Sequence, residues 1–227
     1  MTRHALVTGV SSGIGLATAR RLLDDGWAVS GLSRGEPPLG HERLTWRATD
    51  LGDPEVLRAT VLDLPAADAV VHAAGLQRTA RLGQLSTRDG ADMWRVHVEA
   101  ASVLVDAAVD RMPRGARVVL VGSRTMTGVP GKSQYAATKA ALVGMARSWA
   151  AELVGRAITV NVVAPGPTDT PMLRDPGRAA TPVRLPPMGA LVDPAEIAGT
   201  VSFLLGPDAR SITGQTLVVC AGTSLGL

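Results

Sequence analysis

Residues 5–15 read ALVTGVSSGIG, and this stretch decides the fold. Ala5–Thr8 is a short apolar run typical of a buried strand, and the pattern from Ile14 to Asp25 predicts a helix. Glycines between a strand and a helix let the backbone approach a phosphate closely, and the helix N-terminus offers unpaired N–H groups. Tight turns also use glycine without any ligand, so the position at the first strand–helix junction carries the argument. We expect this turn to hold a dinucleotide pyrophosphate. The expected contacts are Gly9, Ser11, Ser12, Gly13, Ile14 and Gly15.

The rest of the chain alternates strand-like and helix-like segments. Further strands are predicted at residues 28–32, 44–48, 69–72, 118–121, 159–163 and 217–219, and further helices at 54–62, 86–112, 133–154 and 193–205. The strands are continuous apolar runs, which indicates a parallel sheet covered by helices on both faces. With no internal repeat or linker, we expect residues 1–227 to form a single doubly wound α/β domain. Seven of the 15 prolines fall within residues 165–192, and we expect about 166–192 to be an irregular substrate lid.

The composition excludes several classes of protein. One cysteine among 227 residues rules out an internal disulfide and a cysteine-rich zinc site, so no metal is expected. No apolar run approaches the roughly 20 residues of a membrane span, and the charges within residues 1–25 do not fit a signal peptide, so we expect a cytoplasmic protein. The net charge is +3, but the arginines are interleaved with acids and only 3% of residues are aromatic, which argues against nucleic-acid binding.

Scarce residue types mark a second candidate site. The chain has one tyrosine, Tyr135, and two lysines, of which Lys139 follows the tyrosine by four residues in a predicted helix. Residues four apart share a helix face, and a nearby ammonium favours the phenolate form of tyrosine. Lowering the tyrosine pKa by about three units takes roughly 4 kcal/mol and produces an acid/base group suited to interconverting a carbonyl and an alcohol. The alternative is a core tyrosine beside a solvated lysine, but use of the only tyrosine argues against chance.

Further candidates sit at the carboxyl ends of predicted strands, where parallel sheets bind ligands. Ser123 follows the strand at 118–121 and is placed to donate a hydrogen bond to a substrate oxygen. Ser33 and Arg34 end the second strand, where an acid usually binds the ribose of NAD and an arginine accommodates the 2′-phosphate of NADP. The arginine favours NADP(H), with NAD(H) as the alternative if Arg34 is only a solvated surface residue.

Taken together, these motifs resemble those of the short-chain dehydrogenase/reductase family. Four blocks match, namely Thr8–Gly15, Ala73–Gly75, Ser123 with Tyr135 and Lys139, and Asn161–Gly166 followed by Thr170. The resemblance spans about residues 5–222, and among known members the chain looks most like the bacterial 3-oxoacyl-thioester (acyl-carrier-protein) reductases. It implies a Rossmann-type sheet with the strand order 3-2-1-4-5-6-7.

The same resemblance implies roles for individual residues. Tyr135 would be the acid/base, Lys139 would hold the nicotinamide ribose, and Ser123 would polarise the carbonyl. Asp50 would contact adenine, and residues 165–170 would hold the nicotinamide carboxamide. The cofactor contacts expected beyond the glycine turn are Ser33, Arg34, Asp50, Leu51, Ala73, Ala74, Gly75, Tyr135, Lys139, Pro165, Gly166, Thr168 and Thr170. Helices at 87–112 and 133–154 commonly form subunit interfaces in this family, which implies a homodimer or homotetramer.

Three positions depart from the family pattern. His97 stands where the family has a catalytic Asn, and it either holds a proton-relay water, because imidazole both donates and accepts, or is a buried residue without a role. His72 replaces the first Asn of an N-N-A-G block, which we interpret as a local packing change. The interval from Ser123 to Tyr135 is one residue shorter than usual, and we expect that loop to adapt so that Ser123 still reaches the site.

The lid and the catalytic residues lead to three functional hypotheses. Arg174, Arg178 and Arg184 in the mostly apolar lid either meet a carboxylate, phosphate or acyl-carrier group or are solvated. The first hypothesis is an NADPH-dependent carbonyl reductase that transfers hydride to a ketone, such as a free or carrier-bound 3-oxoacyl thioester, and yields a secondary alcohol. The second is an NAD-dependent secondary alcohol or dihydrodiol dehydrogenase. The third is a dinucleotide-binding sensor without turnover.

Overall fold

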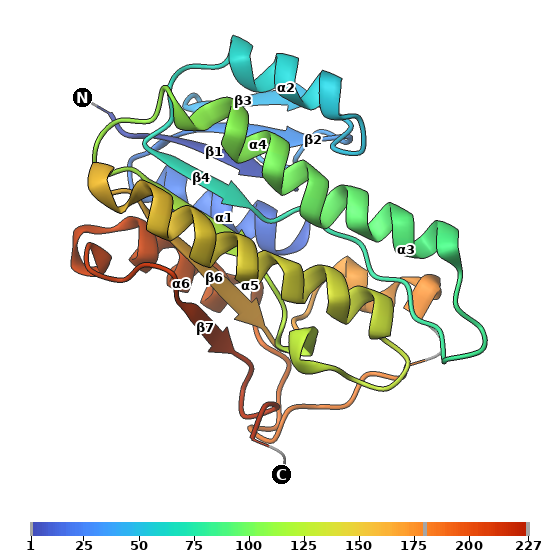
Figure 1. Cartoon of the computed structure of the whole chain (residues 1–227). Coiled ribbons are helices and arrows are strands. Elements are labelled where there is room, and N and C mark those ends of the chain that lie inside the picture. Colours follow the sequence, from blue (N-terminus) through green and yellow to red (C-terminus); the bar gives the residue numbers. More distant parts are fainter. Residues whose placement is uncertain (1, 179–180, 226–227) are drawn as a thin grey trace.

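The computed structural model describes residues 2–178 and 181–225, and its centre is a seven-stranded sheet (Figure 1). The strands are β1 (His4–Thr8), β2 (Ala28–Ser33), β3 (Leu44–Ala48), β4 (Ala69–His72), β5 (Arg117–Val121), β6 (Thr159–Pro165) and β7 (Thr216–Val219). All neighbouring pairs are parallel. Their order is β3-β2-β1-β4-β5-β6-β7, which confirms the expected doubly wound arrangement. The order reverses between β1 and β4, and ligands bind such sheets in the crevice beyond the carboxyl ends at that point.

Helices cover both faces of the sheet (Figure 1). On one face, α1 (Gly13–Asp24) packs against α6 (Pro194–Leu205). The other face carries α2 (Pro54–Asp63), α4 (Ala100–Val109) and α5 (Ser133–Leu153), with α3 (Thr87–Trp94) leading towards α4. Among the described helices, none is long and apolar enough to cross a membrane.

Two apolar cores, one on each face, hold these layers together. In β1, Leu6 belongs to the core beneath α4 and α5, and Val7 belongs to the core beneath α1 and α6. The same alternation repeats in β4, where Val70 joins the first core and Val71 the second. Because both faces are buried, these strands appear in the sequence as continuous apolar runs.

The single helix expected at residues 86–112 is interrupted in the structure. Arg95–Glu99 form a π-helical turn between α3 and α4, and α4 ends at Val109. A π turn closes its hydrogen bonds over five residues instead of four, and such turns are frequent at functional sites. His97 lies at the middle of this turn and is fully buried. The sequence pattern, read as one continuous helix, did not predict this interruption.

The segment after β6 is irregular, as its prolines predict, and contains the short 3₁₀ turns Pro171–Arg174 and Pro176–Arg178. A bridge between Thr168 and Val192 joins its two ends. An ion pair between Arg78 and Asp175, at 3.1 Å, ties its middle to the loop after β4. We call this segment, residues 166–192, the lid; residues 179 and 180 of the expected lid lie outside the described residues.

Candidate active site

The turn after β1 has the geometry of a phosphate-binding loop. Gly9 and Gly13 have φ angles of 76° and 55°, in the left-handed region that favours glycine. At Gly15, a Cβ atom would lie 2.2 Å from the carbonyl oxygen of Gly9, so a side chain does not fit there. Ser12, which precedes α1, makes no side-chain cap, and the first turn of α1 holds no acid. The N–H groups of this helix N-terminus are therefore available to an anion, and the residues fit a dinucleotide pyrophosphate.

The ends of β2 and β3 carry the residues expected to contact the adenosine half of a dinucleotide. Arg34 is exposed and forms no salt bridge with any described residue, so its guanidinium is free to meet a phosphate. Asp50 is exposed, and its carboxylate accepts a hydrogen bond from the Gly52 N–H at 2.9 Å. Ser33 does not fit the expectation, because its buried hydroxyl donates to the Gly35 carbonyl at 2.7 Å and accepts from the Trp46 indole at 3.2 Å.

The segment after β4 is bound to β1 through Thr8. The Thr8 hydroxyl accepts hydrogen bonds from the N–H groups of Ala73 and Ala74 at 3.1 and 3.2 Å and donates to Nδ1 of His72 at 3.0 Å. Nε2 of His72 donates to the Val96 carbonyl at 3.1 Å, so the ring is the neutral Nε2–H tautomer. Burial lowers the pKa of His72 to about 3. His72 therefore has a packing role and links β4 to the π turn.

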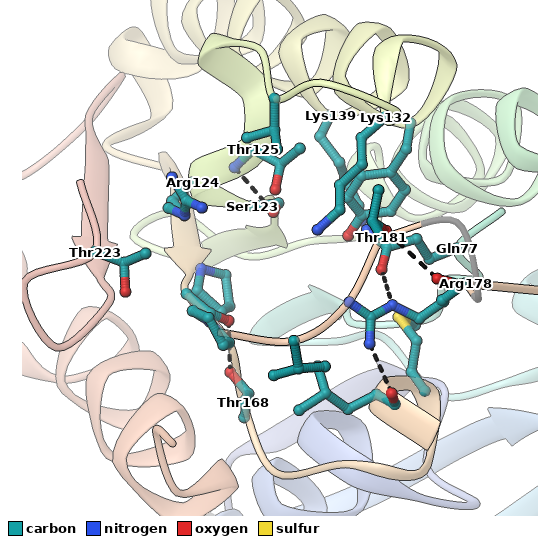
Figure 2. A pocket seen from close by; sticks show the side chains of 18 of the residues that line it. Gln77, Ser123, Arg124, Thr125, Lys132, Lys139, Thr168, Arg178, Thr181 and Thr223 are labelled. Atoms are coloured by element: carbon teal, nitrogen blue, oxygen red, sulfur yellow. Dashed lines mark hydrogen bonds between the residues drawn. The ribbon is translucent and has the colours of Figure 1, made fainter. Parts of the chain in front are cut away.

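A cavity of about 840 Å³ lies where the central strands end (Figure 2). Ser123, Tyr135 and Lys139 all line it. The expected cofactor contacts on the same wall are Ile14, Ala73, Gly75, Pro165, Gly166, Thr168 and Thr170. Those that lie away from this wall are Gly9, Ser11, Ser12, Gly13, Gly15, Ser33, Arg34, Asp50, Leu51 and Ala74. The residues that line the cavity share its wall with the expected catalytic residues, as the nicotinamide end of a dinucleotide requires. Most of the residues away from the wall belong to the glycine turn and to the ends of β2 and β3.

Tyr135 and Lys139 are buried together on α5. The Lys139 ammonium lies 5.9 Å from the centroid of the Tyr135 ring and donates to the Val121 carbonyl at 2.9 Å. Burial lowers the pKa of Lys139 to about 7. Burial raises the pKa of Tyr135 above its usual value, opposed by the Ser123 hydroxyl and the Arg178 charge. The expectation that Lys139 lowers the pKa of Tyr135 is therefore not met, because desolvation of the phenol dominates.

Ser123 reaches the cavity despite the shortened interval. It precedes the 3₁₀ turn Arg124–Thr127, and its Oγ accepts a hydrogen bond from the Thr125 N–H at 3.1 Å. Because that bond uses a lone pair, the hydroxyl proton is available for donation into the cavity. The Ser123 hydroxyl opposes the rise in the pKa of Tyr135, and both residues line the cavity. The two groups can therefore act on one substrate oxygen.

His97 lies behind the catalytic residues, and the protein uses both of its ring nitrogens. Nδ1 donates to the Thr138 hydroxyl at 2.8 Å, and that hydroxyl donates to the Tyr135 carbonyl at 2.9 Å. Nε2 accepts from the Leu76 N–H at 3.0 Å, and the ring stands edge-on to Tyr135 with centroids 5.6 Å apart. Burial and the Lys139 charge hold the pKa of His97 well below its usual value. Of the two alternatives for His97, the relay water does not fit this geometry, because both ring nitrogens already have protein partners. The buried imidazole has a positioning role.

Sequence reasoning missed several polar residues of the cavity wall, namely Gln77, Arg81, Arg124 and Lys132. For Lys132 a signal existed, because it is the other of the two lysines and precedes Tyr135 by three residues. Of the three lid arginines, Arg178 and Arg184 line the cavity, whereas Arg174 is exposed and pairs with an aspartate at 2.5 Å. Arg178 is only 6% exposed, so it is not the solvated residue that the sequence left open.

The arrangement of turn, cavity and catalytic side chains defines a class of protein, the nucleotide-dependent oxidoreductases that act on CH–OH or C=O groups. Comparison with known proteins then gives the family. A family model described as enoyl-(acyl carrier protein) reductase matches residues 9–224. The chain belongs to the short-chain dehydrogenase/reductase family, and it is an enzyme of that family.

Individual relatives match over nearly their whole length. The 3-oxoacyl-[acyl-carrier-protein] reductase of Vibrio cholerae is 37% identical over 235 residues, which cover 96% of each chain. The corresponding reductase of Mycobacterium tuberculosis is 34% identical over 233 residues, which cover 100% of this chain and 94% of the relative. The crystal structure of a short-chain dehydrogenase from Burkholderia cenocepacia in complex with NADP is 34% identical, with a TM-score of 0.87 and 97% of each chain covered.

Proposed function

We propose that this protein is an NADPH-dependent carbonyl reductase that converts a ketone to a secondary alcohol. The observation that carries the proposal is that Tyr135 and Ser123 line one cavity, which Gly166 and Thr170 of the expected nicotinamide site also line. The names of the Vibrio and Mycobacterium relatives, which are reductases of 3-oxoacyl groups, support a ketone substrate. The NADP in the Burkholderia structure supports the choice of cofactor.

Bound NADPH supplies the hydride that reaches the carbonyl carbon. Ser123 donates a hydrogen bond to the carbonyl oxygen and so stabilises the negative charge that develops there. Tyr135 is protonated at neutral pH, because burial raises its pKa, and it transfers its proton to the same oxygen. One hydride and one proton convert the carbonyl to the alcohol. The Lys139 ammonium beside the ring stabilises the phenolate that remains.

The direct test is to measure NADPH consumption with a panel of simple ketones and 3-oxoacyl thioesters, and to identify the alcohol by chromatography. We expect one alcohol formed for each NADPH consumed. Tight NADPH binding without turnover on any member of the panel would contradict the proposal and favour the nucleotide sensor.

Arg34 decides between the two nicotinamide cofactors. Its free guanidinium at the end of β2 is placed to bind a 2′-phosphate, which only NADP(H) carries. We expect Arg34→Ala to weaken NADPH binding by about 10-fold or more and to leave NADH binding unchanged, because a charge-assisted bond to phosphate is lost. Fluorescence titration of both cofactors measures this, with Arg20→Ala, an exposed arginine on α1, as the control. Unchanged NADPH affinity in Arg34→Ala would favour the NAD-dependent alcohol dehydrogenase.

A further inference from the structure

The cavity wall carries an excess of positive charge. Beyond Lys139, five cationic side chains line it, namely Arg81, Arg124, Lys132, Arg178 and Arg184. They come from four separate segments: the loop after β4, the 3₁₀ turn after β5, the start of α5, and the lid. No aspartate or glutamate is among the described residues of the wall. Figure 2 shows Arg124, Lys132 and Arg178 around the cavity together with Ser123.

Four of these cations form no ion pair within the part of the chain that the structure describes, and the fifth, Arg178, interacts with the charge of Asp175. Arg81, Arg124, Lys132 and Arg184 form no salt bridge there, although other arginines of the protein do. Burial and the charges of Arg178 and Arg124 lower the pKa of Lys132 to about 8, so the like charges act on one another. Like charges held together in a partly desolvated site destabilise the folded chain unless an anion binds between them.

The cofactor phosphates have binding groups elsewhere. The pyrophosphate fits the N-terminus of α1, and a 2′-phosphate fits Arg34 at the end of β2. The cationic residues line the same cavity as Tyr135, and two of them belong to the lid. A substrate that carries an anion would neutralise them.

Arg178 is held in a fixed position beside the reacting groups. Its Nε donates to the Gln77 side-chain oxygen, and its Nη1 donates to the Leu173 carbonyl at 2.7 Å. Its charge lowers the pKa of Tyr135, and both residues line the cavity. A planar guanidinium binds carboxylates and phosphates in two-point geometry, and a lysine adds a compact second charge.

We propose that the ketone reduced by this enzyme carries an oxyanion, a carboxylate or a phosphate ester, and that Arg178 and Lys132 bind it. This inference rests on the proposed carbonyl reduction, whose substrate class it names. A neutral 3-oxoacyl thioester offers no such group near its carbonyl. The preferred substrates are therefore short keto acids or keto phosphates instead of thioesters.

Matched substrates test the proposal on the wild-type enzyme with NADPH at pH 7. The pairs are 3-oxobutanoate with its methyl ester and dihydroxyacetone phosphate with dihydroxyacetone, beside 3-oxobutanoyl-N-acetylcysteamine as the thioester. We expect kcat/KM for the charged member of at least one pair to exceed that for the neutral member and for the thioester by about 10- to 100-fold. The pair with the larger ratio identifies the oxyanion. Equal or better activity on the neutral compounds would overturn the proposal and leave the reductase function in place.

Two variants locate the anion-binding groups. Lys132→Met removes a side chain that makes no hydrogen bond with the described residues, and Arg178→Met removes the lid guanidinium. Each is expected to lower kcat/KM for the charged substrate at least about 10-fold and to lower that for its neutral partner by a clearly smaller factor. Arg174→Met, on the same lid but exposed and paired with Asp169, is the control and should change neither value. An unchanged ratio of charged to neutral activity in Lys132→Met would contradict the assignment even if Arg178→Met fails to fold.

A binding measurement separates this inference from the proposed reaction. Calorimetric titration of the NADP⁺-bound enzyme with 3-methylbutanoate, in which a methyl group replaces the carbonyl oxygen, reports carboxylate binding without turnover. We expect 3-methylbutanoate to bind the wild-type enzyme and to bind Lys132→Met at least about 10-fold more weakly. We expect the methyl ester of 3-methylbutanoate not to bind. Binding of this kind with no turnover of any ketone would refute the reductase and retain the anion site. Equal binding of acid and ester would refute the anion site.

Discussion

His72 and His97 are both buried and neutral, and each bridges segments that position the catalytic residues. The unfolded chain protonates a histidine near pH 6.5, whereas folded His72 does so only near pH 3. Between these values the unfolded state binds more protons than the folded state. The free energy of unfolding therefore falls as the pH falls through this range, by about 1.4 kcal/mol per pH unit for each such histidine.

His72→Gln tests this linkage. We expect the free energy of unfolding to depend less steeply on pH between 6 and 4 in the variant than in the wild type, by about 1.4 kcal/mol per unit. Urea unfolding at several pH values measures the slope, with His41→Gln, near the surface, as the control. Parallel profiles for His72→Gln and the wild type would contradict the burial of a neutral His72.

Individual residues show what sequence can and cannot reveal. Tyr135, Lys139 and Ser123 were found from scarcity, spacing and position on strands, and the structure brings all three to one cavity. The direction in which the Tyr135 pKa shifts from its usual value was not predictable, because it depends on burial within the fold. The internal use of the Ser33 hydroxyl and the occupied nitrogens of His97 likewise depend on partners that are distant in the sequence.

At the scale of elements, α5 and the π turn form one positioning unit. The α5 face that carries Tyr135 and Lys139 also carries Thr138, whose hydroxyl accepts from His97 on the π turn. Through Leu76, the same imidazole holds the segment that follows Gly75 in the cavity wall. The interruption of the helix therefore fixes both sides of the active site.

Replacing His97 should destabilise the fold around α5 and the π turn, because His97 holds these elements together and does not itself take part in proton transfer. We expect His97→Leu to lower the free energy of unfolding by about 2–4 kcal/mol, because Leu76 N–H and Thr138 Oγ1 lose a buried partner. We expect kcat to fall while the KM for NADPH changes little. His97→Asn, which both donates and accepts, should recover part of the stability. Urea unfolding and steady-state kinetics measure both effects, and a His97→Leu variant as stable as the wild type would contradict the role.

Most element positions were predictable, and long-range contacts between elements were not. The helix expected at residues 193–205 is α6, which begins at Pro194 behind a capping box formed by Asp193 and Glu196. The predicted strands agree with the structure to within two residues. The ion pair of Arg78 with Asp175 and the docking of Arg178 on Gln77 join segments about a hundred residues apart. Sequence spacing carries no information about such pairs, so the charged character of the cavity wall emerged only with the fold.

For the whole molecule, parallel strands joined by helical crossovers explain why the functional residues meet. The crossovers that carry α4 and α5 follow the usual right-handed rule and lie on the face opposite α1. The crossover between β6 and β7 departs from it, because α6 packs beside α1. All carboxyl ends then lie at one edge, where Ser123 after β5 and Gly166 after β6 meet residues of α5. The sheet order and this edge were both expected from the family resemblance, and the structure confirms the order.

The oligomeric state remains a prediction from that resemblance. We expect a homodimer or homotetramer that uses α3, α4 and α5 as interfaces, and the Trp94 side chain on α3 is about half exposed. Sedimentation velocity at micromolar concentration should show the assembly, and Trp94→Glu should weaken it, because a charge would then be buried. A monomer at all concentrations tested would contradict this expectation.

The central claim is that Tyr135 supplies the proton for carbonyl reduction with NADPH. The most direct test is the single-turnover rate of NADPH oxidation on a ketone substrate, measured for the wild type and for Tyr135→Phe with NADPH binding measured in parallel. The variant lacks one hydroxyl and keeps the ring, so we predict unchanged NADPH binding and a rate lower by about 10²- to 10⁴-fold. A Tyr135→Phe enzyme that oxidises NADPH at the wild-type rate would contradict the account.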